Sequence, residues 1–102
     1  WKKAVAAMGQ SGGEAETVTD EEILEAQRLL ARSEGIFTEP AGAAPIAAIT
    51  KLSERRALDA DEIVVCVATG HGLKDPETAL KSCSPPVEVE AKLGTLRSVV
   101  GV

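Results

Sequence analysis

Residues able to do chemistry gather in one short stretch, residues 69–75, which reads TGHGLKD. His71 is the only histidine of the chain and could act as an acid or base near neutral pH. No serine or cysteine is paired with His71 by a sequence pattern, so a structural or loop-orienting role is favoured. Lys74 carries an amine that could attack a carbonyl, but beside Asp75 we expect a solvated ion pair.

Gly70 and Gly72 follow an apolar run and could be read as the start of a dinucleotide-binding loop. Asp75 stands where that fingerprint has its third glycine, and its charge would face a pyrophosphate. The pattern therefore does not favour a dinucleotide. The two glycines are instead expected to let the backbone turn sharply, either as plain architecture or to bring Thr69 close to a flat ligand.

The remaining polar candidates carry weaker signals. Cys66, Cys83 and His71 offer at most three soft ligands without the close cysteine spacing of zinc sites, so no metal is predicted. Cys66 lies within the apolar run and is expected to be a small core residue. Glu39 precedes an apolar helical segment, where a carboxylate either caps backbone N–H groups, which is the default, or faces a ligand.

The apolar run that positions this stretch is Ile63-Val64-Val65-Cys66-Val67. A continuous run of mainly β-branched residues is typical of a strand buried on both faces in a parallel sheet. Helix, polar connection, buried strand and glycine loop follow one another as in an α/β fold, whose ligands bind beyond the carboxyl ends of strands. A site, if present, is expected in the loop after this strand.

Two longer helices are predicted before that strand. Thr19 and Glu22 form a T-x-x-E capping box, and Gly35 stands where a left-handed residue ends a helix, which predicts a helix over residues 20–33. Its apolar face would hold Ile23, Ala26, Gln27 and Leu30. Because Pro45 is tolerated only in a first turn, the second helix is predicted to begin near Gly42.

Shorter elements are predicted elsewhere. They are a helix from Trp1 ended by the glycines at 9, 12 and 13, a weak strand over 14–18, a helix from Asp75–Pro76 to about Leu80, and a final helix bearing Val89, Leu93, Leu96 and Val100.

Composition limits the function classes. The chain has 102 residues and a formal net charge of −5, with its bases scattered, so nucleic acid is not an expected partner. At 44% hydrophobic residues it is too apolar for disorder, and no apolar run reaches the roughly 18 to 20 residues that a membrane helix needs. Two cysteines favour a reducing compartment, which we take to be the cytoplasm. The chain begins at Trp1 in mid-pattern, so the gene product is expected to extend upstream.

Several strings together are similar to one family. Residues 64–67 with TGHGLKDP at 69–76, EGIFTEPA at 34–41, VTDEEIL at 18–24 and SGG at 11–13 resemble the C-terminal part of the threonine synthase family. The likeness covers essentially the whole chain and weakens after Pro86. It implies part of the large domain of a fold type II pyridoxal-phosphate enzyme, with helices packed on a short, mostly parallel sheet.

The resemblance also implies a chemistry and a division of the chain. The family converts O-phosphohomoserine and water to threonine and phosphate with pyridoxal phosphate, and Thr69 has the place of the hydroxyl residue that contacts the pyridine nitrogen. A neutral hydroxyl, unlike a carboxylate, does not hold that nitrogen protonated. Gly70, His71 and Gly72 would wall the cofactor edge, with Glu39 and Ala41 near the active-site side of their helix. Residues 1–84 would belong to the catalytic domain and residues 85–102 to a tail.

Nothing in the chain matches the family's cofactor lysine, its substrate-carboxylate loop or its phosphate loop, and Lys74 is not that lysine. We therefore expect a fragment without catalytic residues that is inactive alone, does not retain the cofactor and self-associates. Its parent is expected to be a homo-oligomer. Two alternatives remain at this stage: an independently folded interaction or small-ligand module, and a fragment of a threonine or serine dehydratase-like enzyme.

Overall fold

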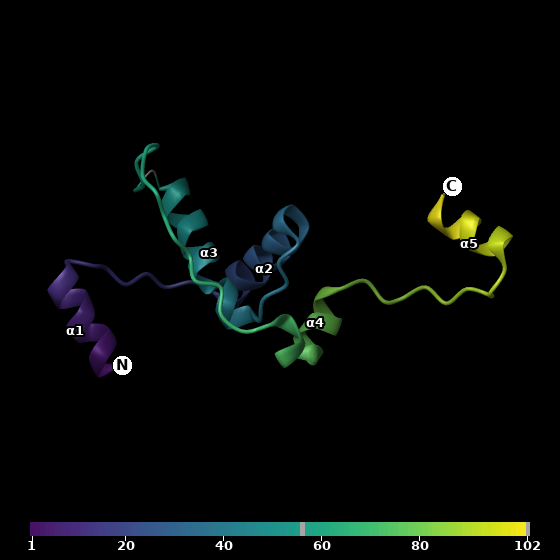
Figure 1. Ribbon diagram of the computed structural model, residues 1–102, viewed down its shortest axis with the longest axis horizontal. Coiled ribbons are helices and arrows are strands. Elements are labelled where there is room, and N and C mark those ends of the chain that lie inside the picture. The colour runs from purple at the N-terminus through teal and green to yellow at the C-terminus, as the bar shows by residue number, and fades with distance from the viewer. Residues whose placement is uncertain (56, 102) are drawn as a thin grey trace.

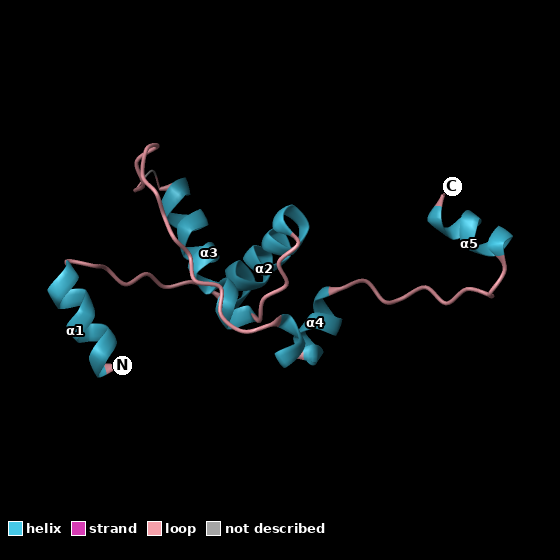
Figure 2. Cartoon of the chain, in the orientation of Figure 1, coloured by secondary structure: helices cyan, strands magenta, loops and turns pink. Residues whose placement is uncertain are grey.

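The computed structural model describes residues 1–55 and 57–101. Figure 1 shows the order of elements, and Figure 2 shows helices joined by loops. The elements are α1 (Lys2–Ser11), α2 (Asp20–Glu34), α3 (Pro40–Glu54), the short 3-10 helix η1 (Gly72–Lys74), α4 (Pro76–Ser82) and α5 (Leu93–Val100). Within the described residues the one β pairing is an isolated antiparallel bridge between Thr38 and His71.

The chain is drawn out along one axis. Its extents are 62 × 31 × 19 Å and its radius of gyration is 18.6 Å, against about 13 Å for a compact chain of about 100 residues. Helices α1 and α5 lie at opposite ends, and α2, α3 and α4 lie between them (Figure 1). Most of the packing is therefore confined to the middle of the molecule.

Helix α2 forms as its sequence predicts. The Glu22 amide donates to Thr19 Oγ1 at 3.2 Å, and the Thr19 amide donates to Glu22 Oε2 at 2.7 Å, so both halves of the capping box are made. Gly35 ends the helix with a φ of 68°, a left-handed conformation that glycine adopts without steric cost. The helix extends one residue beyond the predicted end.

Helices α2 and α3 pack on each other through small side chains. Ala26 of α2 and Ala43 and Ala47 of α3 are buried, with Val18, Ile23 and Ile46 packed around them. An alanine has no atom beyond Cβ, so two helix backbones can approach closely where alanines face each other. This pair is the core of the described molecule.

A charged cluster ties the segment before α2 to the end of α3. Lys51 Nζ donates to the Thr17 carbonyl at 2.6 Å and lies 3.7 Å from Glu16 Oε1 and 3.6 Å from Glu22 Oε1. Arg55 Nη1 lies 2.9 Å from Glu16 Oε2. The Thr17 amide donates a hydrogen bond to the Glu16 carboxylate, and this bond, followed by the nearby Arg55 and Lys51 charges, lowers the pKa of Glu16 below its ordinary value.

Helix α3 begins earlier than predicted. The helix starts at Pro40 and not near Gly42, so Pro45 lies inside the helix and not in its first turn. The carbonyl that loses its helical partner to Pro45 is that of Ala41, an exposed residue to which water has access. The loss of one hydrogen bond near the helix end is tolerated there.

The prediction of a buried strand over residues 63–67 is not confirmed. No strand is assigned here, and Ile63, Val65 and Val67 are 91%, 83% and 69% exposed. A strand exists only where a neighbouring backbone pairs with it, and the described residues place none beside this run. The weak strand predicted over 14–18 is absent for the same reason.

The short helices agree better with prediction. Helix α1 runs through Gly9 and ends at Gly12, with a φ of 70°. Helix α4 begins after Asp75 as predicted and ends at Ser82, and α5 begins at Leu93, beyond the predicted Val89. None of the helices in the described ranges combines the length and apolar character that a bilayer-spanning helix needs.

Candidate functional site

The predicted site loop, residues 69–72, is attached to the segment that leads into α3; we call it the glycine loop. The Glu39 amide donates to the Gly70 carbonyl at 3.1 Å, and the Gly72 amide donates to the Phe37 carbonyl at 3.0 Å. These two bonds hold the glycine loop beside the N-terminal end of α3. They span more than thirty positions of sequence and are made wholly within this chain.

Thr38 is the buried polar link beneath the glycine loop. It is 2% exposed, and its hydroxyl lies 2.5 Å from the Thr69 carbonyl and 2.9 Å from the Gly70 carbonyl. Its own carbonyl accepts a 2.7 Å hydrogen bond from Gln27 Nε2, which is also buried. Sequence reasoning missed Thr38, although a buried amide such as Gln27 on an apolar helix face signals that a polar partner lies nearby.

Two glycines let these backbones approach closely. A Cβ added to Gly42 of α3 would fall against Thr38 Oγ1 and the Thr69 carbonyl, and one added to Gly72 would fall against the Phe37 ring. Real side chains do not tolerate such contacts, so both positions require the absence of a side chain. Only Gly72 was singled out from the sequence as a site residue, whereas Gly42 had been considered as a helix start.

Glu39 faces the glycine loop and does not cap its helix. Its side chain makes no capping hydrogen bond to the α3 backbone, and the default prediction was therefore wrong. One carboxylate oxygen lies 3.5 Å from Thr69 Oγ1, and the other lies 2.8 Å from Lys74 Nζ. Lys74 is an ion-pair partner as expected, but with Glu39 and not with Asp75. Gly70 has a φ of +47°, and a Cβ there would meet the Glu39 carboxylate.

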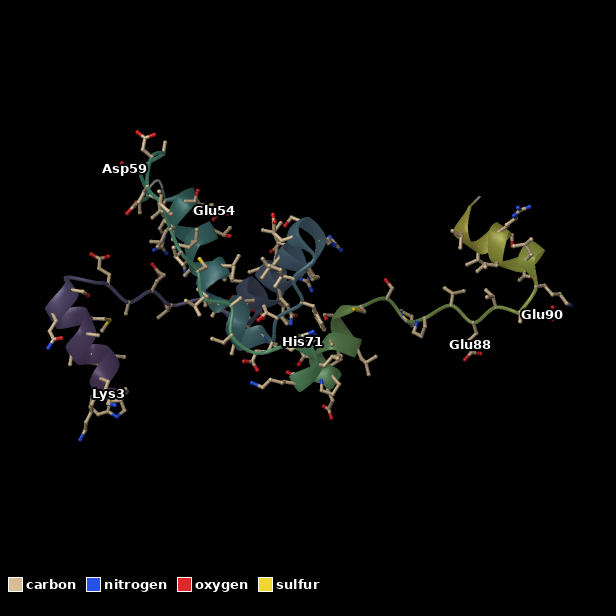
Figure 3. All side chains as sticks on the ribbon, viewed as in Figure 1. Lys3, Glu54, Asp59, His71, Glu88 and Glu90 are labelled. Atoms are coloured by element: carbon tan, nitrogen blue, oxygen red, sulfur yellow. The ribbon has the colours of Figure 1, made fainter. Side chains whose placement is uncertain are left out.

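His71 orients the loop, the role that the sequence favoured. Its Nδ1 accepts a 3.2 Å hydrogen bond from the Leu73 amide, at the start of η1. Its ring meets the Phe37 ring edge to face, with centroids 5.9 Å apart and an interplanar angle of 88°. Figure 3 shows His71 in the middle of the molecule, near α4. Ala41, the other weaker candidate, is exposed in the first turn of α3.

Asp75 caps α4 directly after the loop. Its Oδ1 accepts a 3.1 Å hydrogen bond from the Thr78 amide. Hydrogen bonds from the Thr78 side chain and backbone, with a smaller contribution from the Lys81 charge, hold the pKa of Asp75 below its ordinary value of 3.8. The Asp75 carboxylate therefore serves as the N-terminal cap of α4.

The two cysteines have different surroundings. The Cys66 thiol is half-buried and lies 3.8 Å from the Pro45 carbonyl of α3. Cys83 is exposed just beyond α4, and both thiols are free. Cys66 is thus half-buried against α3, and not the core residue that was predicted.

The chain belongs to a known class of protein. A profile of the family described as pyridoxal-phosphate dependent enzyme matches residues 2–70, and the chain belongs to this family. Among curated proteins, the chain is 52% identical over 98 residues to the threonine synthase of Methanocaldococcus jannaschii, and 50% identical over 98 residues to that of Methanosarcina acetivorans. The threonine synthase of a Synechocystis strain is 48% identical over 92 residues.

These alignments cover most of the chain but a small part of each relative. They span 96%, 96% and 90% of the chain, and 24% of each of the three relatives. The chain therefore spans about a quarter of the length of the curated relatives that it matches. The resemblance to threonine synthases read from the sequence is confirmed.

Proposed function

We propose that this chain forms the C-terminal part of a threonine synthase, a pyridoxal-phosphate lyase that converts O-phosphohomoserine and water to threonine and phosphate. The observation that carries the proposal is the identity of about half of the aligned residues, over nearly the whole chain, to several threonine synthases. Identity at that level, extending from α1 to the tail, is more specific than the family match alone.

The glycine loop is proposed to line the cofactor. Thr69 is exposed and bears a neutral hydroxyl, which can bond a pyridine nitrogen. Beside it, Gly70 is exposed and has no side chain of its own, so a flat ring can come close to its backbone. These features support Thr69 at the ring nitrogen, with Gly70, His71 and Gly72 walling the ring edge.

Glu39 and Ala41 are proposed to lie on the active-site side of α3. For Glu39 the support is the 3.5 Å distance between its carboxylate and Thr69 Oγ1. For Ala41 the support is that it is exposed in the first turn of α3. Pyridoxal phosphate, when bound, supplies an electron sink for the substrate's reacting carbons. This chain's residues hold and orient the ring, and we propose that no catalytic residue lies among them.

The lysine that attaches the cofactor is proposed to lie elsewhere in the enzyme. Lys74 is engaged by Glu39 at 2.8 Å, which supports a structural role for its amine. The loops that hold the substrate carboxylate and the cofactor phosphate are likewise assigned to the remainder of the protein. We therefore propose that this chain alone is inactive and does not retain the cofactor.

We further propose that residues 63–67 form a strand of a mostly parallel sheet completed by the rest of the enzyme. Their β-branched character and their exposure here support this, because a run so apolar is stabilised by burial on both faces. Residues 1–84 would then belong to the catalytic domain. Residues 85–102 would form a tail, supported by the absence of regular structure over 83–92 of the described chain.

The complete enzyme is proposed to be a cytoplasmic homo-oligomer. Free thiols at Cys66 and Cys83 support a reducing compartment. Exposed apolar side chains, such as Trp1 at 89% and Ile63 at 91%, support burial against other parts of the enzyme or another copy.

The test uses the full-length protein that carries this segment, reconstituted with pyridoxal phosphate and supplied with O-phosphohomoserine. We expect release of phosphate in step with formation of threonine, without ammonia. A Thr69→Ala variant of the same protein should lose most of this activity, while a Thr50→Ala variant, changed at an exposed hydroxyl of α3, should keep it. Release of ammonia from threonine or serine would indicate a dehydratase instead, and failure to bind the cofactor would overturn the proposal.

A further inference from the structure

The peptide that joins Thr69 to Gly70 is held from below by the hydroxyl of Thr38. A hydroxyl has one hydrogen to donate, and the shorter of its two distances, 2.5 Å against 2.9 Å, assigns that hydrogen to the Thr69 carbonyl. The Gly70 carbonyl has a second donor, the Glu39 amide at 3.1 Å. Within the part of the chain that the structure describes, the Thr69 carbonyl has no donor other than Thr38. One buried hydroxyl therefore fixes the orientation of this peptide.

The direction of the Thr69 carbonyl also sets the direction of the Gly70 amide. The peptide is trans, so its C=O and N–H groups point in opposite directions. Thr38 is 2% exposed, so the carbonyl points into the protein and the N–H points away from the interior. Gly70 is exposed, and its amide donates to no acceptor in the described ranges. The amide is thus available to a ligand on the exposed side of the glycine loop.

Gly70 would let this peptide turn over if the hydroxyl were absent. Its φ is +47°, and a glycine adopts negative φ values about as readily as positive ones. When a peptide turns over, its C=O and N–H groups exchange places, so a ligand would meet an acceptor where it now meets a donor. The hydrogen bond from Thr38 opposes this change, because the buried hydroxyl would lose its acceptor.

Gln27 of α2 holds Thr38 in turn. Its Nε2 donates to the Thr38 carbonyl at 2.7 Å, and the Gln27 side chain is 3% exposed. A hydrogen bond in such a buried place is stronger than the same bond in water, and it restricts the backbone that carries the hydroxyl. Gln27 can therefore act on the glycine loop through Thr38, from an element that does not belong to the loop.

We propose that Gln27 and Thr38 are positioning residues that hold the peptide between Thr69 and Gly70 in one orientation, so that the cofactor side of the glycine loop presents the Gly70 N–H and not the Thr69 carbonyl. The inference rests on the proposed function, because it requires the exposed side of the loop to face the cofactor. The competing explanation is that the two side chains only satisfy buried polar groups and stabilise the fold.

The experiment uses the full-length protein loaded with pyridoxal phosphate. It measures the visible circular dichroism per bound cofactor, which reports the groups around the ring, and the dissociation constant of the cofactor. Thr38→Val keeps the shape of the side chain, and it should change the ellipticity and weaken binding about tenfold, because the peptide then occupies the wrong orientation most of the time. Thr38→Ser keeps the hydroxyl and should restore both values.

Gln27→Met removes the amide at the other end of the pair. It should shift the ellipticity and the dissociation constant in the same direction as Thr38→Val, by a smaller factor. The double variant should equal Thr38→Val alone, since Gln27 acts through the hydroxyl. Thr50→Val is the matched control, because it removes an exposed hydroxyl of α3 that bonds its own helix, and it should leave both values unchanged.

A lower urea midpoint with wild-type ellipticity and dissociation constant in Thr38→Val and Gln27→Met would show that the pair only stabilises the fold. That result would overturn the inference and leave the proposed function intact. If Thr38→Val does not fold, Gln27→Met decides alone by the same two measurements. Losses that multiply in the double variant would overturn the action of Gln27 through Thr38. Failure of the wild type to bind the cofactor would instead defeat the proposed function.

Discussion

The glycine loop and the apolar run directly before it are neighbours in sequence with opposite surroundings. Backbone bonds join the loop to Phe37 and Glu39, and Thr38 bonds it from below. Ile63 and Val65, a few residues earlier, are almost wholly exposed. A loop whose partners lie within the chain is thus fixed, whereas an apolar run that no described backbone pairs with remains exposed.

This contrast separates two ways in which sequence specifies structure. The glycine loop is specified by contacts with residues 37–42, which lie on the segment leading into α3 and on its first turn. The run at 63–67 is specified by hydrophobic character alone, which demands burial but does not supply the neighbour. Glu88 and Glu90, on the extended tail shown in Figure 3, are charged and do not require burial.

The largest expected effect concerns the open run. In the full-length protein, Val65→Asp should destabilise folding by about 4 kcal/mol, because a charge would be buried unpaired within a sheet. Val87→Asp, a matched change in the tail at a residue 70% exposed, should cost less than about 0.5 kcal/mol. Urea unfolding of both variants measures the difference. Equal and small effects would show that residues 63–67 stay exposed in the whole protein and that the sheet proposal fails.

The second-largest effect is expected from Gly42→Ala, which should destabilise the contact between α3 and the glycine loop. The new Cβ meets Thr38 Oγ1 and the Thr69 carbonyl, and such overpacking costs about 3 kcal/mol, of which the better helix propensity of alanine returns about 1. Gly9→Ala in α1, where nothing lies within 4 Å of the added Cβ, should instead stabilise slightly. Unfolding free energies and hydrogen exchange at the Gly72 amide report both effects. Unchanged protection in Gly42→Ala would mean that the loop is not docked there.

Sequence alone predicted the local features well. The capping box of Thr19 and Glu22, the left-handed Gly35 and the cap at Asp75 are all present, because each is decided by residues within one turn of the helix end. The sharp turn at the glycine loop was also predicted, and the role of this loop as a ligand site stays a prediction. The resemblance of the whole chain to threonine synthases identified the family.

Features set by distant contacts were missed or misjudged. Thr38 and Gly42 serve the glycine loop from more than twenty-five positions away, and nothing local marks them. Glu39 was expected to cap its own helix, but Lys74 and Thr69 draw its carboxylate to the loop instead. Pro45 was expected in a first turn, yet the helix tolerates it where water can bond the carbonyl left without a partner. The strand predicted at 63–67 is not confirmed, since no backbone among the described residues pairs with this run.

A smaller effect is expected from Thr38→Val, which keeps the shape of the side chain and removes the hydroxyl. The carbonyls of Thr69 and Gly70 would lose a buried donor, at a cost of about 1 kcal/mol. Thr50→Val removes a hydroxyl that bonds only the Ile46 carbonyl of its own helix, on an exposed residue, and should cost less than about 0.5 kcal/mol. If the urea midpoints shift equally for the two variants, the hydrogen bonds of the buried Thr38 hydroxyl add nothing to the stability of the protein.

The smallest expected effect is a pH dependence at the end of the loop, where Asp75 caps α4. Thr78 hydrogen bonds, aided by the Lys81 charge, lower the pKa of Asp75 below 3.8 in the folded state. The unfolded chain therefore takes up a proton more readily, so the stability from this group is fully present above about pH 5 and is lost as the pH falls through the folded pKa. Asp75→Asn should match the wild type closely at pH 7, because asparagine caps helices about as well as aspartate.

The wild type should therefore become less stable than Asp75→Asn as the pH falls from 6 to 3, because only the wild type has a carboxylate to protonate at this position. Added salt should weaken only the part that Lys81 contributes, since exposed charges are screened while hydrogen bonds to Thr78 are not. Curves for the two proteins that stay parallel over this range would show that the Asp75 carboxylate does not hold α4. The glycine loop would then be secured on its α3 side alone, and the contrast with the open run would rest on Thr38, Glu39 and Gly42.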